Sequence, residues 1–193
     1  MITNNQVTWV ILAGGRASRM GGQDKGLIRY QGKALIRHVL DAISPTASRI
    51  LICANRNTDE YAQFAPVIQD QITGYAGPLA GLHAALLSST TEWTGILPCD
   101  GPFVNHTIIE RFNQAADASG KVFVAHDGEK IQPVYALVHR SVLPELEQYL
   151  RQGERKVALF YKKCGASNVD CSDIRTMFTN MNTPEQLTQS KEG

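Results

Sequence analysis

The chain has 193 residues, enough for one domain with a substantial hydrophobic core, and no linker divides it. Hydrophobic residues make up 43% of the sequence and charged residues 19%, which excludes a disordered chain. The net charge of +1 argues against a general attraction to nucleic acid or to a membrane surface, so any anion must be bound locally.

Strands and helices alternate through the first 120 residues. An apolar, β-branched run at 7–12 stops at glycine and predicts a buried strand, whereas apolar residues at helical spacing between 33 and 43 predict an amphipathic helix. In chain order, strands are predicted at 7–12, 50–54, 67–68 and 94–97, and helices at 33–43, 59–64, 78–88 and from an Asn105 cap to about residue 118.

The last third of the chain is predicted to mix both element types. Strands are expected at 121–125, 132–138, 168–170 and 177–179, and helices at 141–150, at 155–163 and from a Thr183 cap onward. The alternation in the first 120 residues is typical of an α/β fold with a mostly parallel central sheet and helices on both faces. We therefore predict a three-layer, Rossmann-like sandwich that forms a single domain over residues 1–193.

The cysteines predict a reducing environment. They form no Cys-x-x-Cys pair and match no zinc pattern, so free thiols are expected. The cysteines concerned are Cys53, Cys99, Cys164 and Cys171.

The N-terminus is polar, and its first apolar run is far too short to cross a bilayer. We expect a soluble cytoplasmic protein with no membrane or nucleic-acid partner.

Four predicted strands end in residues that suit a ligand site. In open α/β sheets, ligands bind beyond the carboxyl ends of the strands, so the loops after residues 12, 54, 68 and 97 should converge. Those loops carry Ala13-Gly14-Gly15, Asn55-Arg56, Asp70 and Asp100.

The loop from Leu12 to Lys25 contains two glycine pairs, Arg19 and a closing Asp24-Lys25. Glycines let backbone N–H groups approach a phosphate, and the two cations suit a triphosphate. The loop contains neither a Walker A motif nor G-x-G-x-x-G. The alternative, a surface loop whose glycines serve only turns, would leave the clustered charges unexplained.

The motif Leu-Ala-Gly-Gly-x-x-x-Arg-Met-Gly with a following Asp-Lys resembles the signature of nucleotidyltransferases with a glycosyltransferase-A-like sheet, the nucleotide-diphospho-sugar transferase type. The sequence is most similar to the molybdenum cofactor guanylyltransferases. Further matches span nearly the whole chain: Gly32-Lys33, Ala54-Asn55-Arg56, Asp70, Gly77-Pro78-Leu79-Ala80-Gly81, Pro98-Cys99-Asp100-Gly101-Pro102-Phe103, Gly153-Glu154-Arg155 and Asn180-Met181-Asn182-Thr183-Pro184-Glu185.

The resemblance implies an enzyme that transfers GMP from GTP to the terminal phosphate of Mo-molybdopterin and releases pyrophosphate. It implies a nucleotide-binding part at about 1–120 and a pterin-substrate part at about 121–193. Molybdenum insertion proteins and apo-molybdoenzymes are its candidate partners, and a monomer is expected. No protein nucleophile is needed, because positioning and charge neutralisation carry this chemistry.

The expected catalytic residues are Arg19, Lys25 and Asp100. Arg19 and Lys25 would neutralise the triphosphate and the leaving pyrophosphate. Asp100 follows a strand and would hold Mg²⁺, which takes oxygen ligands from one or two carboxylates and from phosphates. Asp100 on its own also fits a turn aspartate before Pro102, and no second metal ligand is identifiable.

The expected GTP-binding residues lie at the strand ends. Guanine N1–H and N2–H₂ are donors, so carbonyl and carboxylate acceptors suit them. Position 53 is Asn in many relatives and Cys53 here, which leaves open whether its side chain or its backbone contributes. Asn55 as a loop cap and Asp70 as a solvated strand end are the structural alternatives. The full set is Leu12, Ala13, Gly14, Gly15, Lys25, Cys53, Asn55, Asp70 and Asp100.

A second group of residues is assigned to the pterin substrate. Gly81, in the first turn of a helix, fits either a bound ligand or tight packing, since glycine there costs about 1 kcal/mol relative to alanine. Arg155 or Lys156 would suit the pterin phosphate. Asn180 and Asn182 would pair with the amide-like pterin edges, although this segment also reads as plain N-capping.

Three other functions remain open. A cytidylyltransferase using CTP or a sugar-phosphate nucleotidyltransferase would share the first motif, although sugar-specific relatives are usually longer. A noncatalytic nucleotide-binding protein that delivers cofactor to apo-enzymes is the alternative from another class.

Overall fold

The computed structural model describes residues 1–14, 24–72, 77–117 and 120–179. Its centre is a seven-stranded sheet in the order β5-β4-β1-β6-β8-β7-β9. The strands are β1 (Val7–Leu12), β4 (Ile50–Cys53), β5 (Val67–Ile68), β6 (Trp93–Pro98), β7 (Val122–His126), β8 (Ile131–His139) and β9 (Ser167–Asp170). Only β8 runs antiparallel to its neighbours in this sheet, so the predicted mostly parallel α/β sheet is confirmed.

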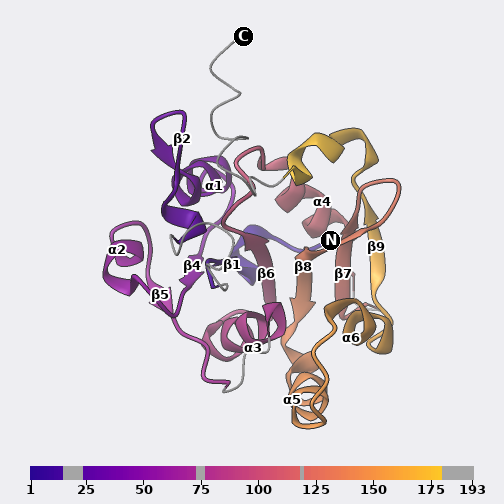
Figure 1. Cartoon of the computed structure of the whole chain (residues 1–193). Coiled ribbons are helices and arrows are strands. Elements are labelled where there is room, and N and C mark those ends of the chain that lie inside the picture. The colour runs from indigo at the N-terminus through magenta and orange to yellow at the C-terminus, as the bar shows by residue number, and fades with distance from the viewer. Residues whose placement is uncertain (15–23, 73–76, 118–119, 180–193) are drawn as a thin grey trace.

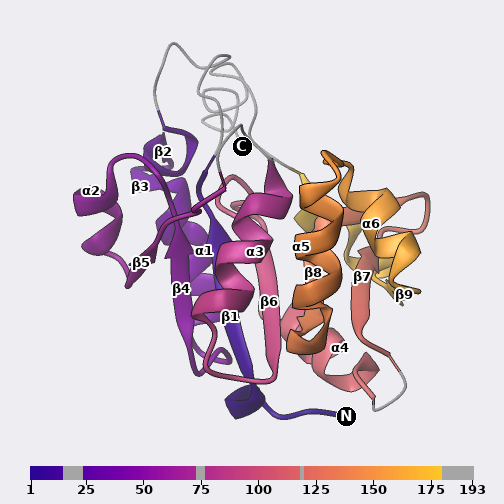
Figure 2. The same ribbon diagram turned by 90° about the horizontal axis from the view of Figure 1, so that it is seen from below.

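Helices cover both faces of the sheet (Figures 1 and 2). On one face lie α1 (Leu35–Ile43) and α4 (Thr107–Ala115), and on the other α3 (Pro78–Ser88), α5 (Leu143–Arg151) and α6 (Val157–Lys163). The short helix α2 (Thr58–Ala62) lies beside the β5 edge. In the part of the chain that the structure describes, no helix is long and apolar enough to cross a membrane.

The burial of each element follows from its sequence. Strand β1 has helices on both faces and is apolar almost throughout, with Trp9, Val10 and Ile11 fully buried. Helix α1 buries one apolar stripe, whereas α3 is apolar nearly all round and is buried along most of its length. The two faces form two separate hydrophobic clusters, one with α1 and α4 and one with α3, α5 and α6.

Two local predictions were wrong. The helix predicted from residue 33 begins at Leu35, because Lys33–Ala34 (β3) pairs with Arg29–Tyr30 (β2) in a hairpin. The turn of that hairpin places Gln31 and Gly32 at φ +48° and +80°, as a tight hairpin turn requires.

The strand predicted at 177–179 is also absent. The 3₁₀ helix η5 (Ser172–Phe178) covers most of this segment. Met177 is buried in the core, and the Phe178 ring lies 4.9 Å from that of Tyr135, edge to face. Packing rather than strand pairing therefore buries Met177 and partly buries Phe178.

The Asn105 cap is present, because Asn105 Oδ1 accepts a hydrogen bond from the Thr107 N–H at 3.0 Å. Helix α4 ends at Ala115, earlier than predicted. The terminal helix predicted from Thr183 lies outside the described residues.

Candidate functional site

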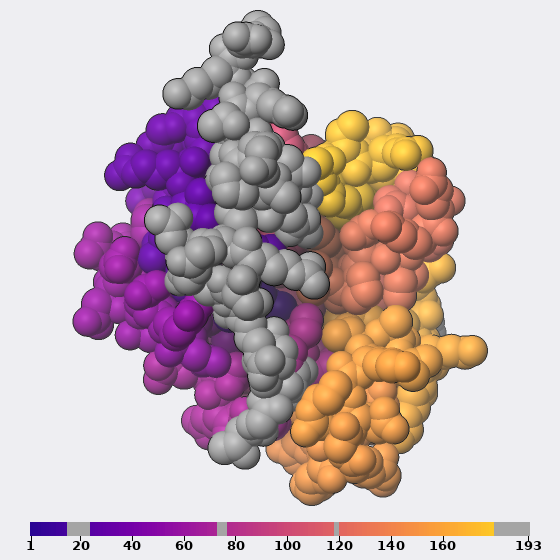
Figure 3. All heavy atoms as spheres, in the orientation of Figure 1, coloured from indigo at the N-terminus to yellow at the C-terminus, as the bar shows by residue number. Residues whose placement is uncertain are grey.

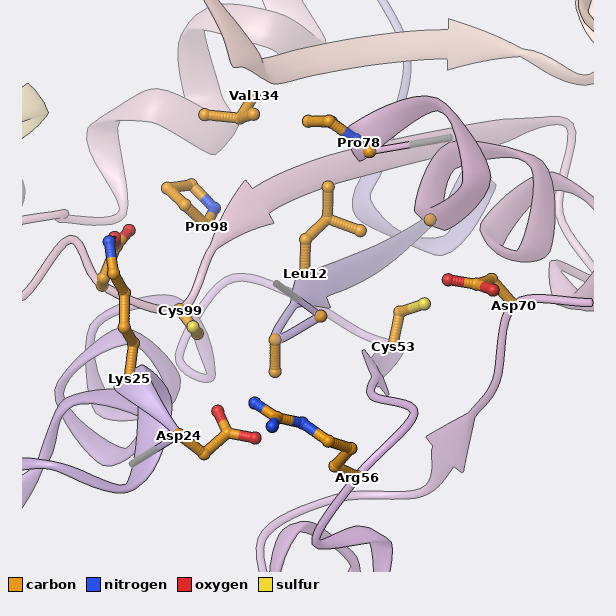
Figure 4. A pocket seen from close by; sticks show the side chains of 15 residues that line it. Leu12, Asp24, Lys25, Cys53, Arg56, Asp70, Pro78, Pro98, Cys99 and Val134 are labelled. Carbon is orange, nitrogen blue, oxygen red and sulfur yellow. The ribbon is translucent and has the colours of Figure 1, made fainter. Parts of the chain in front are cut away.

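A cavity of about 250 Å³ opens at the carboxyl edge of the parallel strands (Figure 4). The predicted convergence is confirmed, since the loops after β1, β4, β5 and β6 all reach it. Helix α3 and strand β8 complete its wall. The lining residues are Leu12, Ala13, Gly14, Asp24, Lys25, Cys53, Arg56, Asp70, Gly77, Pro78, Gly81, Pro98, Cys99, Asp100 and Val134.

Lys25 and Asp100 form an ion pair within this wall. Lys25 opens the 3₁₀ helix η3 (Lys25–Leu27), and Asp100 follows β6. Lys25 Nζ donates to Asp100 Oδ2 at 3.2 Å, and the Asp100 side chain is only 12% exposed. Two residues 75 positions apart in sequence thus place opposite charges together at the cavity.

Asp24 is a buried carboxylate held from below by helix α2. The Tyr61 hydroxyl donates to Asp24 Oδ1 at 2.5 Å, and Asn57 Nδ2 donates more weakly to Oδ2 at 3.4 Å. Burial raises the pKa of Tyr61, which keeps its proton available for this bond. A β-carbon at Gly26 would meet the same hydroxyl at 2.5 Å, so glycine is needed there. Nothing in the sequence pattern indicates a role for Tyr61, because a tyrosine on a short helix is typical of an ordinary core residue.

Asn55 and Asp70 bond to each other at the far end of the cavity. Asn55 Nδ2 donates to Asp70 Oδ2 at 2.6 Å, and the Asp70 N–H donates to Asn55 Oδ1 at 3.0 Å. Asp70 lines the cavity, whereas Asn55 is not among its lining residues. In Figure 4, Asp70 and Cys53 lie on one side of the labelled side chains, and Asp24 and Lys25 on the other.

Cys53 places its thiol beside Asp70 (Figure 4). Burial, and secondly the charge of Asp70, raise the pKa of Cys53 from 9.0 to about 12, so the thiol is neutral near pH 7. The backbone carbonyl of Cys53 accepts from the Ala13 N–H at 2.8 Å, and that of Leu12 accepts from the Cys99 N–H at 3.2 Å. The Ala13 N–H is therefore already used within the sheet rather than turned to a ligand.

Gly81 lies in the first turn of α3 and lines the cavity. A β-carbon there would approach Leu12 Cδ2 to 2.9 Å, so the glycine lets α3 pack closely against β1. Tight packing, the structural alternative for this residue, is thus present, and the pterin assignment of Gly81 stays a prediction.

Arg56 and Val134 line the cavity but were given no role from sequence. The Arg56 side chain points toward Asp24 in Figure 4. Arg56 directly follows Asn55 in the loop after β4, and this position could have indicated its place in the cavity wall. Val134 comes from β8, whose antiparallel direction brings its first half to this edge, and nothing in the sequence pattern indicated that reversal.

The remaining predicted residues lie elsewhere. Arg155 is not among the residues that line the cavity, and its guanidinium donates to the Leu150 and Glu154 carbonyls at 2.9 and 2.7 Å. Gly15, Arg19, Asn180 and Asn182 lie outside the described residues.

The carboxylates at the cavity suit a hard cation that takes most of its oxygen ligands from a bound substrate. Within the described ranges, no group of three or more His, Cys, Asp or Glu side chains could hold a metal by itself. Asp100 and Asp24 are the carboxylates that line the Lys25 side of the cavity. One or two carboxylates combined with substrate phosphates is the usual arrangement for Mg²⁺.

A mostly parallel sheet with a lysine–aspartate pair and a carboxylate-lined cavity at its carboxyl edge fits the nucleotidyltransferase class. A family model described as the MobA-like NTP transferase domain matches residues 9–164, and the chain belongs to this family.

Curated relatives match nearly the whole chain. The chain is 50% identical over 189 residues to the molybdenum cofactor guanylyltransferase of Vibrio parahaemolyticus, which covers 98% of this chain and 97% of the relative. It is also 50% identical over 185 residues to the enzyme of the same description from Vibrio cholerae, which covers 96% and 91%.

A solved structure shares the fold. The molybdopterin-guanine dinucleotide biosynthesis protein A from Archaeoglobus fulgidus superposes with a TM-score of 0.78 at 25% sequence identity, covering 96% of this chain and 97% of that one.

Proposed function

We propose that this protein transfers GMP from GTP to the terminal phosphate of Mo-molybdopterin, forming the guanine dinucleotide cofactor and pyrophosphate. The observation that carries the proposal is the polarity of the cavity: a lysine–aspartate pair lies on one side and an amide-oriented carboxylate on the other. A triphosphate suits the first side and a guanine edge suits the second. The names of the full-length relatives support the choice of substrates.

The chain's own residues act chiefly by binding and orientation. In this proposal Lys25 releases Asp100 and turns its ammonium to the triphosphate, where it neutralises charge that builds on the leaving pyrophosphate. Holding the acceptor phosphate in line with the α-phosphorus would favour its attack over that of water. The attacking group is already an anion, and no side chain has to remove a proton.

Magnesium is part of the proposal. Asp100, released from Lys25, would hold the ion, with Asp24 as the nearby second carboxylate of the cavity wall. An ion held there would supply positive charge that offsets the charge of the triphosphate. Arg19 is proposed as a second phosphate cation.

The acceptor is proposed to bind toward the C-terminal part of the chain. Figure 3 shows residues of the first half on one side of the carboxyl edge and residues beyond about 120 on the other. Arg155 lies between α5 and α6 in that second part. Gly81, Arg155, Asn180 and Asn182 remain the candidate pterin contacts.

Location and association state complete the proposal. All four cysteines are free thiols, as in proteins of a reducing compartment, which supports a cytoplasmic enzyme. We propose a monomer that hands its product to apo-molybdoenzymes, alone or with molybdenum insertion proteins.

The test is a pyrophosphate-release assay with Mg²⁺ and Mo-molybdopterin, run separately with GTP, CTP, UTP and ATP. Only GTP should give pyrophosphate, and only when the pterin is present. A preference for CTP would instead identify a cytidylyltransferase. Tight GTP binding without pyrophosphate release would point to a noncatalytic carrier.

A further inference from the structure

The strand end that carries Asp70 is weakly held by the sheet. Strand β5 lies at the sheet edge and contains only Val67 and Ile68, which pair with Ile52 and Cys53 of β4. Two further backbone bonds flank this pairing, from the Ile52 N–H to the Pro66 carbonyl at 2.9 Å and from the Ala54 N–H to the Ile68 carbonyl at 3.0 Å. Asp70 lies two residues beyond that last bond, where backbone pairing alone would leave its side chain loosely placed.

Asn55 supplies the missing restraint. Its Nδ2 donates to the Asp70 carboxylate at 2.6 Å, while its Oδ1 accepts from the Asp70 N–H at 3.0 Å. One amide thus binds the backbone and the carboxylate of the same residue, which fixes both the position and the rotation of that carboxylate. Both hydrogen-bonding ends of Asn55 are used on this one partner.

The Asp70 carboxylate keeps acceptor capacity for a ligand. Its Oδ1 accepts no hydrogen bond from any residue that the structure describes, and Oδ2 retains a second lone pair beyond the Asn55 bond. Guanine presents N1–H and N2–H₂ side by side, and two such donors require an acceptor whose plane is set in advance. The neighbouring Cys53 thiol is neutral and adds no competing charge.

We propose that Asn55 is a positioning residue that sets guanine selectivity through Asp70, rather than a residue that contacts the base. The proposal rests on the guanine-nucleotide function given above. In this proposal the Asp70 carboxylate accepts hydrogen bonds from guanine N1–H and N2–H₂, and Asn55 sets the orientation of that carboxylate.

The test compares GTP with ITP, which lacks only the 2-amino group of guanine. Dissociation constants for both are measured by calorimetry with Mg²⁺ on the full chain, for the wild type and for Asn55→Ala. The wild type should prefer GTP, and Asn55→Ala should lose about tenfold of that preference, the worth of one well-aligned hydrogen bond to a charged acceptor. The dissociation constant for ITP should change little in Asn55→Ala, so the lost preference should come from weaker GTP binding.

Two further variants sharpen the result. Asn55→Asp keeps an acceptor for the Asp70 N–H but removes the donor and places a second carboxylate against the first, so it should lose the GTP preference as well. Asn168→Ala, an exposed strand asparagine on β9, is the matched control and should keep it.

Equal weakening of GTP and ITP in Asn55→Ala would overturn the inference, because a direct contact to shared base atoms, or a purely structural role, predicts that result. An unchanged GTP preference in Asn55→Ala would also overturn it while leaving the proposed function intact. A wild type that does not discriminate GTP from ITP would contradict the role of Asp70 in binding guanine. A wild type that prefers CTP would contradict the proposed function itself.

Discussion

Lys25 and Asp100 hold opposite charges 3.2 Å apart in a cavity proposed to receive a polyanion. The pair gives each of these partly buried groups an opposite charge as its partner. When a triphosphate with its cation enters, each member gains a stronger partner. In the proposed function, triphosphate binding must therefore break this ion pair, and substitutions of its two members should have different effects.

Asp100→Asn should reduce turnover by about 100-fold or more, because the variant loses the charge proposed to hold the metal near the phosphates. Thermal unfolding should stay close to wild type, since an amide can still accept from Lys25. Steady-state pyrophosphate release measures the first effect and calorimetry the second. Asp41→Asn removes an exposed carboxylate that pairs with Lys33 and is the control; near-normal turnover in Asp100→Asn would remove the metal assignment.

Tyr61→Phe should destabilise the protein by about 1–3 kcal/mol, because the buried Asp24 carboxylate loses its short hydrogen bond and keeps only a weak one. GTP binding should weaken too, since Asp24 precedes Lys25. Urea denaturation and nucleotide titration test the two effects. Tyr149→Phe, which loses a bond to the Lys156 carbonyl, should lower stability only, so a Tyr61→Phe variant with unchanged GTP affinity would contradict the coupling.

At the scale of the element, α3 and β1 approach each other through a glycine. Gly81→Ala should gain helix propensity of about 1 kcal/mol, but its β-carbon must displace Leu12 Cδ2, the end of a flexible side chain. Because Leu12 lines the cavity, the displacement should raise KM for GTP while the unfolding midpoint changes little. Ser88→Ala at the exposed end of the same helix is the control, and a normal KM in Gly81→Ala would show that Leu12 relaxes away from the cavity.

Strands β1 and β6 depend on a second glycine. Trp9 lies opposite Gly95 in the register, and a β-carbon at Gly95 would overlap the indole ring. Gly95→Ala should therefore cost about 1–3 kcal/mol or more of unfolding free energy, as overpacking does. The double variant with Trp9→Leu should recover part of that loss in denaturant titrations. Additive losses in the double variant would mean that the ring is not the obstacle.

The elements with strong local patterns were predictable, and those defined by distant partners were not. Pro78–Ser88 matched its prediction because a proline start and a long apolar run specify a buried helix by themselves. The β2–β3 hairpin was missed since Lys33 and Ala34 have no strand pattern and are ordered by their turn. Met177 and Phe178 resemble a strand locally, and only the core behind them decides otherwise.

The same division holds for the site. Strand-end residues such as Asp70 and Asp100 could be placed together from the fold class alone, because parallel strands share one carboxyl edge. The Tyr61 bond to Asp24 could not, since it depends on how α2 folds back beneath the loop. The Asn55–Asp70 bond joins two predicted residues, yet their mutual pairing was not visible in the spacing.

For the whole molecule, buried thiols and phenols set an alkaline limit to stability. Burial raises the pKa of Cys99, Cys53 and Tyr61 above their ordinary values. A group with a raised folded-state pKa contributes fully below its unfolded pKa, and that contribution is lost as pH rises toward the folded value. The unfolding free energy should therefore fall above about pH 9, by up to roughly 1.4 kcal/mol per pH unit for each group that titrates.

Urea titrations between about pH 8 and pH 10.5 measure this slope. Cys99→Ala should flatten it, because one titrating thiol is removed from the unfolded chain. Cys164→Ala, at a less buried thiol, should flatten it less. Unfolding free energies that stay level or rise across this interval would contradict the burial argument.

The central position of β1 also affects how the nascent chain is protected during synthesis. This strand is made first, but both its neighbours, Ile50–Cys53 and Trp93–Pro98, are made much later. Until then its apolar surface and open backbone groups have no partner, and such edges invite mispairing. We expect productive folding to wait until the chain has grown past Pro98, which makes the first hundred residues the segment on which chaperones would act.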